Sequence, residues 1–465
     1  MGQRTSFYKD QEAAYRSGTD LFEKEKFSAA QKAFEFVIAN EANPISVLRV
    51  NAEYYDAVCA LELYNGDAEY KFTEFLRRHP SSSRVNLINY QLGRLAYTNK
   101  KYNSAQVYFE KVDQSDLNKD QLDEFHFKKG YSFFKTDDLD KSKTEFQKIT
   151  NPGSKYKSPA NYYLSHIAYT NGDYETALTG FNDLINDDNF KAVAPYYIIQ
   201  ILFVQEKYDE VLAMAPGMLE TATEKRAPEI NRVIGESYYR TGKFGEALPY
   251  LEAYHITKGL AVAREDNYSY GFCLYKATKY EAAAEYFQKV TGTQDKLSQY
   301  AYYYLADCYL KLDKKQFAAN AFNSAYKLTF DTDIREDALF NQAQLAFDLS
   351  YDPYNEAIKA LKDYLRTYPN SSRNDEAYNF LYRISLATGN FKDAQDALDN
   401  IKMKGSDYNL NYQKIALYRG IEFYNQFNDE EAIKMFKKAA NIDADKAITA
   451  EAIFWTGESF YRADN

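Results

Sequence analysis

The sequence has few of the residues from which most enzyme and metal sites are built. It contains three cysteines and four histidines in 465 residues. Cys59, Cys273 and Cys308 form no CxxC pair, so neither a zinc site nor a disulfide framework is expected. No HExxH, GxSxG, P-loop or GxGxxG motif occurs. We therefore expect no catalysis, no metal, no other cofactor and no small-molecule substrate.

Positive charge and long apolar runs are also lacking. The net charge of -10, from 57 basic and 67 acidic side chains, disfavours a surface for nucleic acid or anionic lipid. No run approaches the roughly 18 apolar residues of a membrane-spanning helix. With 45% hydrophobic and 27% charged residues, the composition is that of a folded protein.

Tyrosine and phenylalanine, in contrast, are abundant, with 45 and 31 copies against a single tryptophan. Some of them belong to a repeated phrase: KKYNSAQVYFEKV at residues 100–112 returns as TKYEAAAEYFQKV at residues 278–290. The shared aromatic, Ala, Phe and Val follow one another at steps of three, four and three residues, which places them on one face of a helix. The phrase therefore indicates a helical repeat.

Further copies appear when the Ala of the phrase is used as a marker. Successive markers lie 34 to 39 residues apart. Their mean spacing of about 36.5 residues is typical of helical solenoids. The twelve markers are Ala30, Ala68, Ala105, Ser142, Ala177, Val211, Ala247, Ala283, Ala318, Ala357, Ala394 and Ala432.

Two further columns of residues accompany the markers. Four residues after each marker lies an apolar residue, which is large in every copy except the one with Ala215: Phe34, Phe72, Phe109, Phe146, Phe181, Leu251, Phe287, Phe322, Leu361, Leu398 and Phe436. Twelve residues before the marker, most copies have a small residue: Gly18, Gly93, Gly130, Gly235, Gly271, Ala306 and Gly420. Asp56, Ile199 and Tyr382 interrupt this second column. We expect two helices per copy, which cross where the small residue meets the Ala, with the later Phe packing into the next copy.

This pattern resembles the tetratricopeptide repeat (TPR), in which a small residue, an aromatic, an alanine and a Phe or Leu stand at fixed positions. The resemblance covers nearly the whole chain. It implies an all-α fold, an α-solenoid of about twelve and a half TPR helix pairs forming a right-handed superhelix. We expect one continuous superhelix over residues 1–465, or two rigid segments with a hinge near the sixth copy, at residues 190–225. The last residues, AEAIFWTGESFYRADN, predict a thirteenth first helix without its partner, so we expect the chain to be a fragment of a longer protein.

In TPR proteins the first helix of each pair lines a concave face. Carried over to this sequence, the resemblance implies a face rich in aromatics, densest from the third to the ninth copy. The predicted partner-binding residues are Tyr90, Tyr97, Phe127, Tyr131, Phe134, Tyr162, His166, Tyr169, Tyr196, Phe203, Tyr239, Tyr268, Phe272, Tyr275 and Tyr303. Tyrosine suits such a surface because its ring is large and rigid and its hydroxyl makes polar contacts. The same side chains can instead wedge between neighbouring first helices and only tighten the stack. We interpret the band as a whole as a contact surface.

The predicted function is a non-catalytic protein–protein interaction scaffold that binds an extended or helical segment of a protein or peptide partner. No copy pairs the Lys and Asn with which some TPR domains clamp a C-terminal carboxylate, so that mode is not supported.

Localisation and two other functions are open at this point. The turns at Pro80 and Pro369 resemble those of bacterial envelope TPR proteins, which implies a periplasmic or outer-membrane-associated complex. A cytoplasmic protein is the alternative. A TPR-based outer-membrane glycan-binding protein, against which the single tryptophan argues, and the adaptor region of a larger enzyme are the other functions.

Overall fold

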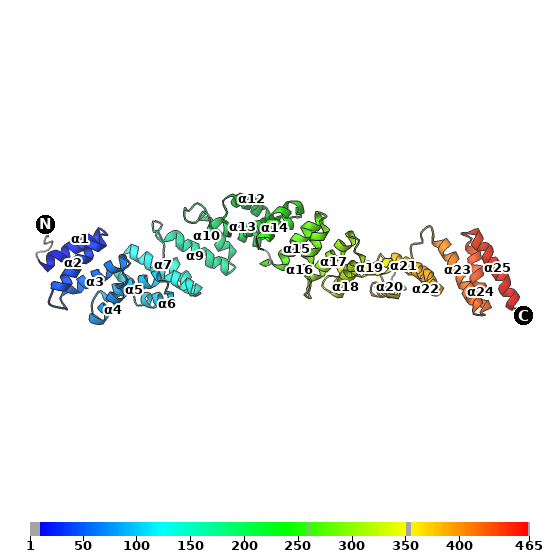
Figure 1. The fold of residues 1–465 in the computed structure, drawn as a ribbon, viewed down its shortest axis with the longest axis horizontal. Coiled ribbons are helices and arrows are strands. Elements are labelled where there is room, and N and C mark those ends of the chain that lie inside the picture. The colour runs from blue at the N-terminus through cyan, green and yellow to red at the C-terminus, as the bar shows by residue number, and fades with distance from the viewer. Residues whose placement is uncertain (1–9, 259–260, 350–354, 464–465) are drawn as a thin grey trace. The chain divides into compact units, whose positions relative to one another are not determined.

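The structure is a computed structural model that describes residues 10–258, 261–349 and 355–463 (Figure 1). These residues form 25 α-helices and two short 3₁₀ helices, and no strand occurs among them. The all-α solenoid and the number of helices expected from the repeat are confirmed. The chain divides into two compact units, residues 1–206 (unit 1) and 207–465 (unit 2), and each is described by itself. A single superhelix over residues 1–465 and a hinge at residues 190–225 stay predictions.

Unit 1 contains eleven of the α-helices found in the described residues. They are α1 (Gln11–Glu23), α2 (Phe27–Asn40), α3 (Val47–Glu62), α4 (Ala68–Arg78), α5 (Val85–Thr98), α6 (Tyr102–Glu110), α7 (Lys119–Lys135), α8 (Leu139–Gln147), α9 (Lys157–Thr170), α10 (Tyr174–Asn182) and α11 (Ala194–Val204), with the 3₁₀ helix η1 (Gln114–Asp116) before α7. Odd-numbered helices are the first and even-numbered helices the second members of the pairs. Each second helix also contacts the following first helix, so the pairs stack in sequence order.

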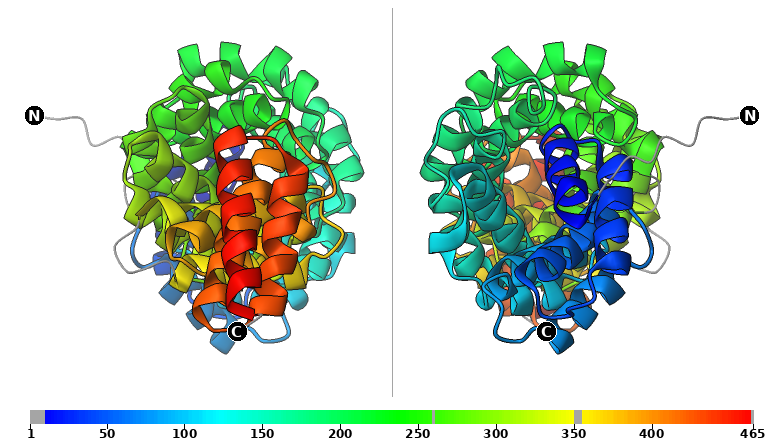
Figure 2. Two further views of the ribbon diagram at one scale, coloured as in Figure 1. Left: turned by 90° about the vertical axis from the view of Figure 1, so that its right-hand side faces the viewer. Right: turned by 90° about the vertical axis from the view of Figure 1, so that its left-hand side faces the viewer.

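Unit 2 continues the same alternation within the described residues. Its helices are α12 (Tyr208–Met218), α13 (Ala227–Arg240), α14 (Phe244–Lys258), α15 (Arg264–Lys276), α16 (Tyr280–Val290), α17 (Lys296–Lys311), α18 (Lys315–Lys327), α19 (Thr332–Leu349), α20 (Asn355–Thr367), α21 (Asn374–Ala387), α22 (Phe391–Asp399), α23 (Tyr408–Asn425), α24 (Asp429–Ile442) and α25 (Lys446–Ala463), with η2 (Leu219–Thr221) after α12. Helices α23, α24 and α25 lie side by side, as Figure 2 shows at the red end of the chain.

A left-handed residue ends the first helices and turns the chain back into the second. Lys100 has φ 59°, and glycine supplies the same conformation at Gly172 (φ 77°) and Gly242 (φ 76°). The next N–H then reaches back over the turn, as from Lys101 to the Ala96 carbonyl at 2.8 Å. This is the hydrogen bond that closes a helix after a left-handed residue. Where the structure describes the turn within a unit, this hydrogen bond fixes a tight antiparallel hairpin.

The core of each unit is built from the two columns of the repeat. All twelve marker residues are at most 1% exposed, and so are the apolar residues four positions later. Burying each Phe that follows a marker by four residues contributes about 1.5–3 kcal/mol. Since every Phe lies between two pairs, the stack is held together by the same contact repeated along the chain.

The glycines of the first helices meet the later Phe or Leu rather than the marker Ala, which corrects the sequence prediction. A Cβ added at Gly93 would lie 2.5 Å from Cε1 of Phe109, and one at Gly420 would lie 2.4 Å from Cε1 of Phe436. Real Cβ atoms do not approach so closely. The ring of the second helix occupies the crossing point, so the first helix has a small residue there to make room for the ring.

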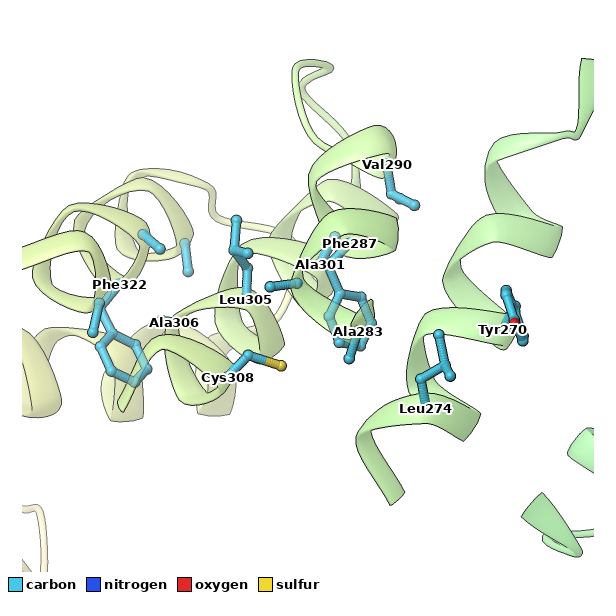
Figure 3. Close-up of a cluster of buried hydrophobic side chains, with 14 of the residues drawn as sticks. Tyr270, Leu274, Ala283, Phe287, Val290, Ala301, Leu305, Ala306, Cys308 and Phe322 are labelled. Atoms are coloured by element: carbon cyan, nitrogen blue, oxygen red, sulfur yellow. The ribbon is translucent and has the colours of Figure 1, made fainter. Parts of the chain in front are cut away.

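Figure 3 shows the core of unit 2 around α15 to α18. Phe287 and Phe322 project between the helices, and Cys308 lies beside them in the same buried cluster. Cys59, Cys273 and Cys308 are all buried and unbonded. Burial raises the pKa of each thiol to about 12. The three cysteines are thus packing residues of the core. In the part of the chain that the structure describes, no helix is both long and apolar enough to cross a membrane.

Candidate partner-binding surface

The first helices contact one another directly as well as through the second helices. In unit 1, α1 contacts α3, α3 contacts α5 and α5 contacts α7. In unit 2, α13 contacts α15, α15 contacts α17 and α17 contacts α19. Direct contacts of this kind place the first helices on the more closely packed side of a stack of helix pairs. Side chains on α1, α3, α5 and α7 therefore share one face in unit 1, and side chains on α13, α15, α17 and α19 share one face in unit 2.

Nearly all of the predicted partner-binding residues are partly accessible on these helices. Tyr90 is the exception, because it is 1% exposed and lies in the core. The half-buried residues are Tyr97, Phe127, Tyr131, Phe134, Tyr162, His166, Tyr169, Tyr196 and Phe203 in unit 1, and Tyr239, Tyr268, Phe272, Tyr275 and Tyr303 in unit 2.

In unit 1 most of these rings form a connected series, called here band 1. Tyr97 contacts Tyr131 with ring centroids 5.5 Å apart, and Phe134 contacts His166 at the same distance. His166 and Tyr169 each lie 5.5 Å from Tyr197 of α11. The remaining members of band 1 are Phe127, Tyr162, Tyr163 and Tyr196. Burial lowers the pKa of His166, which favours its neutral form among these rings.

Unit 2 has a shorter series, called here band 2. Tyr239 contacts Phe272 at 6.0 Å, and Phe272 contacts both Tyr268 and Tyr275. Tyr275 then contacts Tyr304 at 5.4 Å. Tyr303, beside Tyr304, completes band 2. Burial raises the pKa of Tyr239 to about 12, so its hydroxyl is neutral at physiological pH.

The sequence prediction missed the rings that join these series. Tyr163, Tyr197 and Tyr304 each stand two residues before the small-residue column. Each stacks on the Phe of the preceding pair: Tyr163 on Phe146 (5.5 Å), Tyr197 on Phe181 (4.7 Å) and Tyr304 on Phe287 (5.8 Å). These contacts confirm that the later Phe packs into the next copy. In the sequence, these three residues could have been identified because each follows another tyrosine, at 162–163, 196–197 and 303–304.

Hydroxyl groups distinguish band 2 from band 1. Tyr275 donates a hydrogen bond of 2.5 Å to Asp307, and Tyr303 donates one of 2.5 Å to Asp337. Both acceptors belong to the next first helix, α17 or α19. In band 1 the tyrosine pair Tyr162 and Tyr197 makes a longer hydroxyl contact of 3.4 Å. Band 2 thus presents aromatic rings together with carboxylates.

A charged cluster lies at the start of band 1. Arg94 of α5 forms ion pairs with Glu62 of α3 at 2.7 Å and with Glu124 of α7 at 2.8 Å. Lys128 contacts the same Glu124 at 2.5 Å. Burial acts to raise the pKa of Glu124, but Arg94 and Lys128 outweigh it and hold the pKa at about 2. Beside this cluster, Glu62, Arg94 and Lys128 line a cavity of about 290 Å³. Arg94 lies on the same first-helix face, but the sequence prediction did not include it because only aromatic side chains and one histidine were selected.

Among the described residues, no group of three or more His, Cys, Asp or Glu side chains is placed to hold a metal ion. His79 pairs with Glu53 at 2.9 Å, and His126 with Glu145 at 2.7 Å, each inside its own helix pair. The single tryptophan, Trp455, packs against Phe436 and Tyr424. It is therefore part of a helix junction.

The arrangement of hairpins stacked in sequence order defines an α-solenoid. Sequence models of the tetratricopeptide repeat match residues 88–119, 274–331 and 337–371. The chain therefore contains tetratricopeptide repeats, as its sequence pattern predicted. Proteins of this class serve as scaffolds for protein–protein interactions.

Solved structures with a similar course of the chain include two protein complexes. One is the APC/C hetero-tetramer Cut9–Hcn1, with 12% identity, coverage of 97% of both chains and a TM-score of 0.26. The other is Naa15/Naa10 bound to HypK-THB, with 13% identity, coverage of 98% of this chain and 73% of the other, and a TM-score of 0.36. At these identities and TM-scores, the two structures say nothing about the partners of this chain. No curated protein matches the sequence.

Proposed function

We propose that the protein is a non-catalytic scaffold that holds a segment of a partner protein against the first helices, with bands 1 and 2 as the contact surfaces. The partner segment is extended or helical, because both forms present a row of side chains to a long face. That the partner is a protein follows from the repeat class, whose members serve as scaffolds for protein–protein interactions.

One observation carries this proposal. Fourteen of the fifteen aromatic and histidine side chains predicted from the repeat are only half-buried, although most of them contact another of these side chains. Rings used for packing alone would be expected to be buried like Tyr90, which is 1% exposed. Connected, partly exposed aromatic rings are the composition typical of the centres of protein interfaces.

The chemistry of the two bands suggests which side chains of a partner each one favours. Band 1 between Phe134 and Tyr197 offers ring faces and edges, which suit apolar and proline side chains. Band 2 adds Asp307, whose carboxylate can accept further hydrogen bonds from Lys or Arg, whereas Asp337 is already paired with Arg373. An apolar segment of a partner would fit band 1, and a basic segment would fit band 2.

Placement in a bacterial envelope complex, periplasmic or associated with the outer membrane, is part of the proposal. Its support is the resemblance of the Pro80 and Pro369 turns to those of envelope TPR proteins. Fractionation of the source cells tests it, and recovery of the protein with the cytoplasmic fraction would replace it with the cytoplasmic alternative.

Affinity capture with paired variants tests the proposed surfaces. Tyr169→Leu combined with Tyr275→Leu keeps an apolar side chain in each packing contact but removes the ring and the hydroxyl. We expect proteins that co-purify with the wild-type chain from its source cells to be lost with this variant, while its circular dichroism stays helical.

Tyr64→Leu combined with Tyr70→Leu is the matched control. These tyrosines are 85% and 67% exposed and lie in the turn before α4 and on α4, outside both bands. The control is expected to retain every partner. Equal loss in both double variants, or no loss in either, would move the binding site away from the bands.

A further inference from the structure

A cavity of about 450 Å³ lies in unit 1 between two loops that join neighbouring helix pairs. Its wall is formed by the loop between α2 and α3 with the start of α3, and by the loop between α4 and α5. Ile45, just before α3, and Val47, the first residue of α3, are 76% and 77% exposed. Val50 lines the same cavity. Exposed aliphatic side chains gathered at a cavity are typical of a contact surface.

The charges around this cavity are all basic. Its charged side chains are Arg78 and Arg84, and the imidazole of His79 lines it as well, whereas no Asp or Glu does. Four other cavities in the described part of the chain each include at least one Asp or Glu in their lining. In a chain with a net charge of -10, this wall is a local site that attracts an anionic group.

Arg84 is held in position by uncharged groups. Its Nε donates a hydrogen bond of 2.9 Å to Oδ1 of Asn51. The guanidinium also lies over the rings of Tyr54 and Tyr55, at 4.8 Å and 5.4 Å from their centroids. No carboxylate among the described residues pairs with it. A guanidinium fixed in this way keeps donors for a carboxylate and loses little side-chain freedom when it binds one.

The arginines near Arg78 do not remove the positive charge. Arg77 and Arg78 both pair with Glu74, at 2.6 Å and 2.7 Å. Glu53 lies 3.9 Å from Arg78 and also pairs with Arg49 at 3.2 Å. Three arginines thus share two carboxylates, so this side of the cavity keeps an excess of positive charge.

We propose that this cavity binds a segment of a partner protein in which an Asp or Glu is flanked by aliphatic residues. The carboxylate pairs with Arg84, and the aliphatic side chains cover Ile45 and Val47. Charge complementarity and the adjoining aliphatic side chains together favour this occupant, because a phosphate or a nucleic acid would leave Ile45 and Val47 uncovered. The site does not rest on the proposed function of bands 1 and 2, because it shares no residue with either.

The methyl groups of Ile45 and Val47 make binding measurable in the intact chain by methyl NMR. The probe is the peptide acetyl-GSLEVSG-amide, and its matched control is acetyl-GSLQVSG-amide, which lacks the carboxylate. We expect saturable shifts of the Ile45 and Val47 methyl signals with the first peptide. The Kd of the second peptide should be about tenfold higher or more, because a hydrogen bond to a charged group is lost.

Arg84→Gln should weaken binding of the acidic peptide by about tenfold or more and remove the difference between the two peptides. Arg77→Gln is the matched control, because it removes the same charge from the end of α4 but does not line the cavity. Its affinity should stay within about twofold of the wild-type value, as expected for an exposed charge outside the site.

Val47→Glu is a second variant that tests the site without altering Arg84. It places a carboxylate in the cavity wall, and because Val47 is 77% exposed, the fold should be unaffected. We expect binding of the acidic peptide to be lost. Val107→Glu on α6, where Val107 is 51% exposed, is its matched control and should bind like the wild-type chain.

Equal affinity for the two peptides, or equal affinity of the wild-type chain and Arg84→Gln, would overturn the proposal. Inorganic phosphate that displaces the peptide at equal concentration would also overturn it, because the site would then select a free anion. If circular dichroism shows that Arg84→Gln is misfolded, unchanged binding by Val47→Glu would have the same consequence. Tyr169→Leu combined with Tyr275→Leu should bind the peptide like the wild-type chain, so failure of the bands and failure of this site can be distinguished.

Discussion

The hydroxyl of Tyr197 in band 1 contacts another tyrosine, whereas Tyr275 and Tyr303 in band 2 donate hydrogen bonds to carboxylates of the next first helix. Tyr303 and Tyr197 illustrate the difference, with hydroxyl contacts of 2.5 Å to Asp337 and 3.4 Å to Tyr162. The ring contacts beneath them are alike, since Tyr197 and Tyr304 stack on Phe181 and Phe287. The comparison teaches that the repeat fixes the packing of the rings, while the residues between its fixed positions decide the chemistry of the face.

The two units also differ in the charged side chain at one position of the repeat. Arg94 of unit 1 and Glu236 of unit 2 each lie eleven residues before their marker. Arg94 is paired with two carboxylates. Glu236 is 3% exposed, and its Oε1 has no hydrogen-bond partner. Burial raises the pKa of Glu236 to about 7. Unit 2 therefore carries a buried group that titrates near neutral pH.

The largest expected effect tests what the two units share. Phe181→Ala and Phe287→Ala should each destabilise its own unit by about 3–5 kcal/mol, because both rings are fully buried and leave cavities. Hydrogen exchange measured on the flanking helices, α9 to α11 and α15 to α17, reports each unit separately. If one substitution lowered the free energy of unfolding of its unit several times more than the other, the claim that both units share the same packing would be wrong.

A second prediction concerns pH and unit 2 alone. The folded-state pKa of Glu236 lies above the value of about 4.5 expected in the unfolded chain, so the folded unit binds a proton that the unfolded chain releases. The contribution of this bound proton to the free energy of unfolding is fully present below about pH 4.5, and it is lost as the pH rises through about 7. At pH 8, Glu236→Gln should therefore stabilise α13 and its neighbours by up to about 3 kcal/mol, and by little at pH 4.5.

The control for this titration is Glu124→Gln in unit 1, where the sign is opposite. Because the pKa of Glu124 is held at about 2, the wild-type carboxylate adds stability above about pH 4.5 that is lost as the pH falls toward 2. Hydrogen exchange at pH 5 and pH 8 distinguishes the two variants. Identical pH profiles for the wild-type chain and Glu236→Gln would show that Glu236 is ionised and solvated in the folded unit.

The smallest expected effect concerns the tyrosine hydroxyls. Tyr303→Phe removes a hydrogen bond to a carboxylate and should destabilise the α17–α19 region by about 1 kcal/mol. Tyr197→Phe removes only a 3.4 Å contact and should cost a few tenths of a kcal/mol. Both changes in the free energy of unfolding are measured by urea unfolding monitored by hydrogen exchange. Equal effects of the two substitutions would remove the distinction between the bands.

Sequence periodicity predicted the parts of this structure that depend on helical spacing. The marker Ala and the later Phe identified every second helix, and the prediction of about 25 helices is confirmed because each copy must bury both columns. The contact made by the small residue was predicted wrongly, since spacing along one helix does not say which side chain of the other helix reaches the crossing point. Gly93 faces the ring of Phe109.

The candidate surface could be predicted only in part. Repeat position placed Tyr131 and Phe272 correctly on the first helices, but it also selected Tyr90, which turns into the core. Tyr163 was overlooked because its position is not among those that line the face in other TPR proteins. The acceptors of the tyrosine hydroxyls, such as Asp337, depend on side-chain rotamers across a helix junction, and a linear sequence does not contain that information.

Site-specific photo-crosslinking tests most directly whether the bands are the binding surface. The photoreactive amino acid p-benzoylphenylalanine, placed singly at Tyr169, Tyr275, Tyr64 and Tyr70 of the intact chain in its source cells, records what lies within reach of each position. Our account predicts crosslinks to a partner protein from Tyr169 and Tyr275 and none from the exposed Tyr64 and Tyr70. Crosslinks to the same partner from Tyr64 and Tyr70, with none from Tyr169 or Tyr275, would contradict it.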